Sequence, residues 1–256
     1  MSRIWPPLLV AALLLGAWEA AVRVWGIPPY ILPAPSVIAV RLVTDWAILG
    51  PALLFTLKTS LLALAAAVLG AGALAVLFAQ SRAVERALFP YAVILQVTPI
   101  VAVAPLIIIW VDNTLSALLI CAWIVAFFPI LSNTTLGLNS ADRNLTALFR
   151  LYGASRWQML RFLRLPSAMP YFLAGLRISG GLSLIGAVVA EFVAGAGGRE
   201  SGLAYRILES GYRLDVPRMF AALFLISAAG VAIYLTLAGF SHLLLRQWHE
   251  SAIERE

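Results

Sequence analysis

Residues 147–166 read ALFRLYGASRWQMLRFLRLP, a basic stretch in a chain that is 62% hydrophobic and only 12% charged. From Gly153 onward, the pattern predicts a moderately amphipathic helix that ends at Pro166. At about 100° per residue, the cationic side of this helix carries Arg156, Arg161 and Arg164, and its apolar side carries Met159, Phe162 and Leu165. Three interpretations are open from these residues alone: a helix held by anionic lipid headgroups, a positive-inside topology signal, or a helix that docks on another protein.

The composition of the whole chain is that of a membrane protein. A soluble domain has about a quarter of its residues charged and roughly half apolar, whereas the mean hydropathy here is +0.94. The net charge of +6 comes from basic residues that lie between apolar runs, which favours topology signalling over nucleic-acid binding. The only cysteine, Cys121, lies inside an apolar run, so an intrachain disulfide is excluded and we interpret it as a small core residue.

Six apolar segments are long enough to cross a bilayer, whose hydrocarbon core of about 30 Å needs about 20 helical residues. They lie near residues 7–25, 53–78, 89–110, 114–136, 171–194 and 218–245. Pro99 and Pro105 interrupt the third segment and are expected to bend it. The first segment is either a cleaved signal peptide or a retained anchor, and we favour the anchor because the apolar run continues past Ala21. With no internal repeat or polar linker, residues 1–256 are expected to form one all-α membrane domain.

The distribution of arginine predicts that both termini are cytoplasmic. With the N-terminus inside, the inner segments carry ten arginines, among them Arg3 and Arg255, and the outer segments carry five, among them Arg199. The inner connection between the fourth and fifth spans, residues 132–170, contains the basic stretch. A connection of this length in a compact protein is usually functional and is expected to hold helices of its own.

No catalytic or metal-binding arrangement is recognisable in the sequence. The only lysine, Lys58, lies in FTLKTS without the glycines of a phosphate-binding loop. His242 and His249 are seven residues apart and lack a cysteine or carboxylate cluster. No Ser-His-Asp or paired-carboxylate arrangement can be assembled on one face. We therefore expect a chain that is not an enzyme and that binds no metal or cofactor itself.

Polar and ionisable groups inside spans are costly, so they mark candidate functional positions. In the third span, Gln96, Thr98 and Pro99 place polar side chains and freed carbonyls at membrane depth, where they are tolerated only against protein or a water-filled path. Glu191 in the fifth span is a further candidate for the translocation path, and capping near the following GAGG turn is its alternative role. For the third span the alternative is a kinked packing helix. Arg177 is expected to extend its side chain toward the cytoplasm.

The opening stretch resembles the cytoplasmic signature of the permease subunits of bacterial binding-protein-dependent ABC importers. That signature is Glu-Ala-Ala, three residues, Gly, nine residues, Ile, one residue and Leu-Pro. Its spacing is matched by Gly153, Leu163, Leu165 and Pro166, with leucine in place of isoleucine. Where the signature has Glu-Ala-Ala, this chain has Ala147, Leu148 and Phe149. The likeness runs from about residue 32 to 248, and ILPAPSVI, PIVAVAPLIIIW and GLRISGGLSLIGAVVAEFVAG resemble the nitrate/sulfonate/taurine group of these permeases.

This resemblance implies a type I ABC importer permease fold with six transmembrane helices and cytoplasmic coupling helices, in a bacterial inner membrane. It further implies a second permease copy, two ATP-binding subunits that bind ATP and Mg on their own chains, and a soluble substrate-binding protein outside. The coupling helices would dock in a groove of each ATPase subunit, with Gly153 allowing a sharp turn after the first of them. The implied coupling residues are Ala147, Leu148, Phe149, Arg150, Leu151, Tyr152, Gly153, Ala154, Leu163, Leu165 and Pro166.

The substrate implied by the resemblance is a small solute. It is either a heterocycle, such as a pyrimidine precursor of thiamine, or a small anion, such as a sulfonate or nitrate. We favour the heterocycle because the third span has no cation at membrane depth. The alternative function is a secondary carrier or channel driven by an ion gradient, which would have only Glu19 and Glu191 as membrane-embedded carboxylates for coupling.

Overall fold

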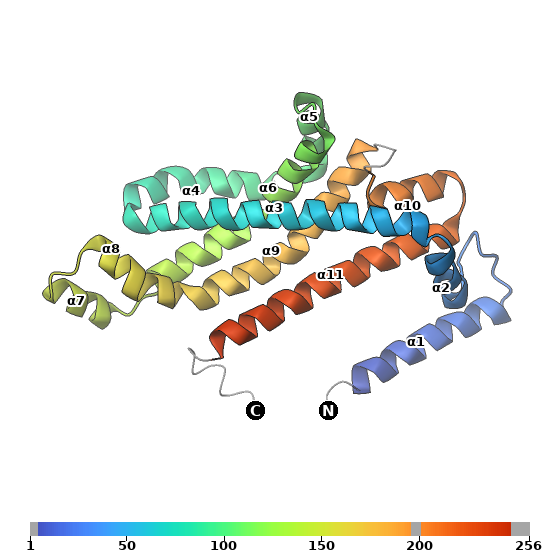
Figure 1. The fold of residues 1–256 in the computed structure, drawn as a ribbon, viewed down its shortest axis with the longest axis horizontal. Helices are drawn as coiled ribbons and strands as arrows, with labels where there is room; N and C mark the ends of the chain where they lie inside the picture. The colour runs from blue at the N-terminus through green and yellow to red at the C-terminus, as the bar shows by residue number, and fades with distance from the viewer. Residues whose placement is uncertain (1–4, 196–200, 247–256) are drawn as a thin grey trace. The chain divides into compact units, whose positions relative to one another are not determined.

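The computed structural model describes residues 5–195 and 201–246, and within these ranges it contains helices and no β-strand (Figure 1). In chain order the elements are α1 (Trp5–Val24), α2 (Pro35–Thr44), α3 (Trp46–Gln80), α4 (Arg82–Val97), α5 (Ile100–Trp110), α6 (Thr114–Asn139), α7 (Arg143–Leu151), α8 (Arg156–Met159), the π-helical turn η1 (Leu160–Arg164), α9 (Leu165–Ala194), α10 (Leu203–Tyr212) and α11 (Val216–Leu245). The all-α prediction is confirmed. Both termini, with Arg3 and Arg255, and also Arg199, lie outside the described residues.

Four helices within the described ranges are long and apolar enough to cross a membrane: α3, α6, the continuous run Arg156–Ala194, and α11. The α4–α5 pair adds a fifth crossing if the bent pair counts as one span. α1 corresponds to the first predicted span and is 20 residues long, but it is not among these helices.

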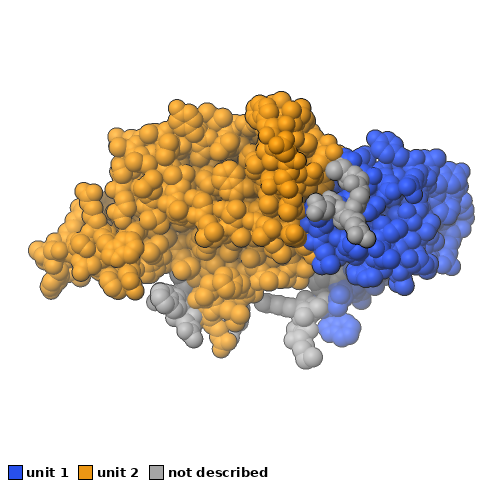
Figure 2. Space-filling view, turned by 45° about the horizontal axis from the view of Figure 1, so that its top comes forward, with its two compact units in different colours: residues 1–56, 195–228 blue, residues 57–194, 229–256 orange. Residues whose placement is uncertain are grey.

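The chain is divided into two compact units (Figure 2). The first comprises Met1–Thr56 with Gly195–Ala228, and the second comprises Leu57–Ala194 with Ala229–Glu256. The long helices α3 and α11 each contribute to both units. Whether residues 1–256 act as a single domain stays a prediction.

The second unit is built on the contact between α6 and α9, which pack along each other through small residues. A Cβ atom added at Gly175 would lie 2.7 Å from the carbonyl oxygen of Pro129, and one at Gly186 would lie 2.9 Å from the Cα atom of Ala122. The hydroxyl of Ser179 donates to the carbonyl oxygen of Ala126 at 2.6 Å. Small residues and hydroxyls of this kind allow membrane helices to approach backbone to backbone. The buried core around this contact includes Ala67, Ala71, Ile130, Leu131 and Leu173.

The first unit combines a small apolar core with ion pairs. Its core consists of Ile38, Leu49, Ala52, Leu203, Ala221 and Ala222. The guanidinium of Arg218 donates to Asp45 at 2.6 Å, and Arg41 pairs with Asp215 at 3.3 Å. On α10, the hydrogen bond from Arg206 at 2.8 Å lowers the pKa of Glu209. The first two pairs connect the C-terminal end of α2 with the start of α11, whereas the Arg206–Glu209 pair lies within α10.

The predicted interruption of the third span is confirmed at Pro99 but not at Pro105. α4 ends at Val97 and α5 begins at Ile100, and their axes differ by 100°. Thr98 adopts an extended conformation with ψ of 121°, which the ring of a following proline favours, and Pro99 has no N–H with which to continue the helix. Pro105, in contrast, lies inside α5 without ending it.

The predicted connection over residues 132–170 is shorter in the structure. α6 continues to Asn139, and α9 already begins at Leu165 and passes through Pro166 and Pro170, so the expected helix end at Pro166 was also wrong. The reason lies in the preceding turn, where the N–H of Leu165 bonds to the carbonyl of Leu160, five residues earlier. This widened turn gives the ring of Pro166 the room that a regular α-helical turn denies it. The predicted helices inside the connection are confirmed as α7, α8 and η1.

Candidate functional site

The candidate site is the helical hairpin formed by α7, the turn Tyr152–Ser155 and α8. α7 begins at a side-chain cap, because the carboxylate of Asp142 accepts hydrogen bonds from the N–H groups of Asn144 at 2.7 Å and Leu145 at 2.9 Å. These bonds satisfy two of the N–H groups that a helix start leaves open. The start of α7 is therefore fixed by its own sequence.

The turn after α7 depends on Gly153, as expected. Its φ of +69° lies in the left-handed region that non-glycine residues rarely adopt. The N–H of Gly153 bonds to the carbonyl of Arg150 at 3.0 Å, and the N–H of Ala154 bonds to the carbonyl of Phe149 at 2.9 Å. A glycine that closes the last turn of a helix in this way reverses the chain within a few residues.

α8 begins at a reciprocal capping box. The hydroxyl of Ser155 accepts from the N–H of Gln158 at 3.2 Å, and the side-chain oxygen of Gln158 accepts from the N–H of Ser155 at 2.7 Å. From there the chain is helical without interruption through η1 to Ala194. The direction of α8 is therefore set by the long helix α9.

The π-helical turn η1 attaches this hairpin to the core. Leu160 is 1% exposed and packs in the core cluster, and Leu163 is also buried. The guanidinium of Arg164 donates to the carbonyl oxygen of Ala79 at 2.6 Å, near the end of α3. An arginine that caps a carbonyl near a helix end is also stabilised by the helix dipole. η1 thus links α9 to α3 and α6.

The predicted apolar side of the 156–165 helix was only partly correct. Met159 is buried as expected, but Phe162 is 63% exposed, and the residues beside Met159 in the interior are Leu160 and Leu163. The π-helical turn contains more residues per turn than an α-helix, so the 100° rule fails across it. Leu163 therefore faces the core of this chain.

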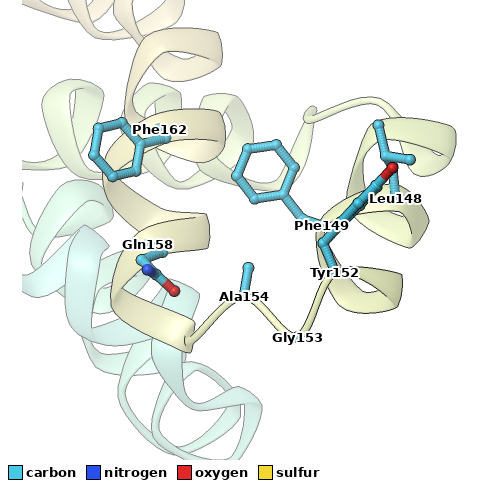
Figure 3. Close-up of a pocket in the computed structure, with 7 residues that line it drawn as sticks. All are labelled: Leu148, Phe149, Tyr152, Gly153, Ala154, Gln158 and Phe162. Carbon is cyan, nitrogen blue, oxygen red and sulfur yellow. The ribbon is translucent and has the colours of Figure 1, made fainter.

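α7 has no buried residue within this chain. Its apolar edge consists of Leu145, Leu148, Phe149 and Tyr152, and Tyr152 and the neighbouring Leu151 are both 82% exposed. A hollow of about 420 Å³ separates this edge from α8 and η1, and Figure 3 shows the ring of Phe149 pointing into the gap. Its lining residues are Leu148, Phe149, Tyr152, Gly153, Ala154, Gln158 and Phe162. An amphipathic helix with an exposed apolar edge is suited to binding a partner.

The predicted coupling residues are only partly gathered on this hairpin. Ala147–Ala154 form the end of α7 and its turn, whereas Leu163 lies buried in η1, and Leu165 and Pro166 begin α9. The coupling role of all these residues stays a prediction.

Sequence reasoning missed the π-helical turn and the contact of Arg164 with α3. It also missed the capping box, although Ser155-x-x-Gln158 is a visible signal for one.

The predicted path residues lie in two places. Gln96, Thr98 and Pro99 adjoin the break between α4 and α5, where the hydroxyl of Thr98 donates to the carbonyl of Ile94 at 2.7 Å. Glu191 lies near the C-terminal end of α9 and is 3% exposed. Their role in a translocation path stays a prediction.

Comparison with known proteins places the chain in a transport family. Residues 64–254 match the family described as binding-protein-dependent transport system inner membrane component. The riboflavin transport system permease protein RibX of Chloroflexus aurantiacus is 36% identical over 96% of this chain and 92% of its own length. The formylaminopyrimidine transport permease protein ThiX of Halalkalibacterium halodurans is 33% identical over 93% of this chain and 94% of its own length.

A solved structure supports the fold. The structure described as an amino acid ABC transporter with histidines has a chain that superposes on this one with a TM-score of 0.64. The likeness covers 80% of this chain and 96% of the other, at 18% sequence identity. It confirms the type I permease fold that the sequence predicted.

Proposed function

The chain belongs to the family of binding-protein-dependent transport system inner membrane components, and from this premise we propose that it is the membrane-spanning permease subunit of an ATP-driven importer. Its substrate is a small nitrogen heterocycle that a soluble binding protein delivers from outside. Two copies of the chain form the path, and two ATPase subunits bind inside. The observation that carries the proposal is the α7–α8 hairpin, an exposed amphipathic helix attached to a long membrane helix.

The coupling mechanism follows from the continuity of the helix behind the hairpin. ATP binding draws the separate ATPase subunits together, and α7 and α8 move with the surface on which they dock. Because α8, η1 and α9 form one uninterrupted helix, a displacement of α8 is transmitted to α9. The tight α6–α9 contact and the bond from Arg164 to Ala79 then carry it to α6 and α3. Rigid, close-packed elements transmit such shifts as whole-helix movements.

The heterocycle assignment rests on two observations. The two relatives described above are permeases whose names specify riboflavin and formylaminopyrimidine, and both compounds contain nitrogen heterocycles. Residues 87–110, which include the α4–α5 break, have no charged side chain. A neutral ring that exchanges hydrogen bonds with Gln96 and with carbonyls freed at Pro99 suits such a site better than a small anion does. A broken helix that lines a path is the usual way to present such carbonyls at membrane depth.

Reconstitution in proteoliposomes tests this function. The permease would be purified with the ATPase subunit, and uptake of radiolabelled riboflavin and of formylaminopyrimidine would be measured with the binding protein outside and ATP inside. We expect uptake that requires ATP and the binding protein and that is unaffected by ionophores. Uptake that persists without ATP and collapses with the ion gradient would instead support a secondary carrier.

A further inference from the structure

The α7–α8 hairpin and the adjoining turn η1 carry arginines whose charge no carboxylate of the described residues neutralises. Four arginines of this segment are exposed: Arg143, Arg150 and Arg156 in the hairpin, and Arg161 in η1. Among the described residues, none of these four forms an ion pair with a carboxylate. The local carboxylate, Asp142, accepts two hydrogen bonds from the backbone at the start of α7. The guanidinium carbon of Arg161 lies 5.7 Å from the ring centroid of Phe162.

The two arginines of α7 lie on the side of the helix opposite its apolar edge. At about 100° per residue, Arg143 and Arg150 are about 20° apart, and both lie about 160–180° from Tyr152. Leu148, Phe149 and Tyr152 line the hollow, and the ring of Phe149 points across it toward α8 and η1 (Figure 3). Arg143 and Arg150 therefore point away from the rest of this hairpin.

The positions of Arg143 and Arg150 distinguish between two possible partners: the phosphates of anionic lipid headgroups and the carboxylates of a docked protein. If α7 lay on the bilayer with its apolar edge in lipid, its two arginines would point into water and away from the headgroup phosphates. A protein surface that receives the hairpin can instead contact both sides of α7. The geometry therefore favours carboxylates of a docked protein over anionic lipid.

We propose that the protein surface on which the α7–α8 hairpin docks is acidic, with carboxylates that pair with Arg143 and Arg150. An apolar side chain of the same surface occupies the hollow beside Phe149. The proposal rests on the proposed function, because the protein that carries this surface is the ATPase subunit. Opposite charges brought together across an interface accelerate docking and fix its register, and close charge pairs also add affinity.

The test compares charge removal with charge reversal. The permease is placed in phosphatidylcholine nanodiscs, and its Kd for the purified ATPase subunit is measured at low and at high salt. Arg143→Gln with Arg150→Gln is expected to raise Kd by about tenfold at low salt, and Arg143→Glu with Arg150→Glu by about a hundredfold. High salt should weaken wild-type binding and strengthen binding of the reversed variant. Arg86→Glu, an exposed site on α4, is the matched control and is expected to change Kd by less than about twofold.

A second measurement locates the carboxylates. Replacing acidic residues in the ATPase docking groove by lysine should restore binding of the reversed variant and weaken binding of the wild type. If the reversed variant binds the ATPase as tightly as the wild type at low salt, the acidic surface is wrong, while ATPase binding itself still supports the permease function. Binding that appears only when phosphatidylglycerol is added would assign the arginines to lipid and overturn the proposal. A wild-type chain that binds no ATPase subunit under either condition would contradict both.

Discussion

The α6–α9 contact and the α7–α8 hairpin lie next to each other in the sequence but are stabilised in different ways. In the first, buried glycines bring two backbones together, and a serine hydroxyl satisfies a buried carbonyl. In the second, α7 buries no side chain, and side-chain caps and one left-handed glycine define its shape. The first region is complete within this chain. The second has an exposed apolar edge and unneutralised arginines, which are features of a surface that another protein completes.

The largest effect is expected in the core contact. Gly175→Val would place side-chain atoms against the carbonyl of Pro129, which as backbone cannot move aside. We expect a loss of about 2–4 kcal/mol of stability, seen as a lower melting temperature in detergent and poor yield. Gly181→Ala on the same helix is the control, because a Cβ there meets no atom within 4 Å. Equal melting of the Gly175→Val variant and the wild type would mean that α6 and α9 are not in backbone contact.

At Gly153 the expected effect is on coupling. Gly153→Val forces a β-branched residue to adopt φ of +69°, at a cost of about 1–2 kcal/mol, so the turn between α7 and α8 changes its path. Membrane insertion and melting temperature should stay close to the wild type, while ATP hydrolysis continues without substrate uptake. Gly153→Asn is the control, since asparagine tolerates the left-handed region and should retain most uptake. Wild-type uptake by the valine variant would argue against a coupling role for this turn.

The capping box offers a smaller change in the same hairpin. Ser155→Ala removes the hydroxyl that accepts the N–H of Gln158 and should cost about 1 kcal/mol of local stability at the start of α8. Hydrogen exchange of residues 156–158 should become about five-fold faster, while exchange in α6 stays unchanged. Ser155→Asp keeps an acceptor at the cap and should restore protection. If exchange is the same in all three proteins, the capping box does not set the start of α8.

The smallest effect is expected for Arg161→Gln. Its side chain is exposed and its guanidinium contacts the ring of Phe162, an interaction worth about 0.5–1 kcal/mol at such a site. Uptake should fall by less than about twofold, because the neighbouring arginines contribute to the same field. The comparison is with Arg164→Gln, which removes the bond to Ala79 and should reduce both stability and uptake more. A stronger loss with Arg161→Gln than with Arg164→Gln would reverse the order that the structure predicts.

The sequence predicted the helical class, most of the spans and the position of the exposed hairpin, because apolar length and the spacing of Gly153 are properties of the chain itself. It did not predict the 100° break at Thr98, because a proline signals a bend and not its angle. It predicted a helix end at Pro166, where the structure has a continuous helix. The π-helical turn that makes room for the proline ring has no clear signal in the sequence. The sequence also included Leu163 among the implied coupling residues, although the Leu163 side chain is buried in the core to which η1 attaches the hairpin.

Thiol crosslinking tests most directly whether the α7–α8 hairpin is the coupling surface. The only native thiol, Cys121, is buried, so Leu151→Cys introduces a single accessible one. Tyr212→Cys on α10 is the matched control, because Leu151 and Tyr212 are both 82% exposed. With a thiol–amine crosslinker on the reconstituted complex, we predict that residue 151 links to the ATPase subunit in a manner that changes with ATP, and that residue 212 does not link to it. A complex that transports substrate but gives no crosslink from residue 151, or gives one from residue 212, would contradict the account.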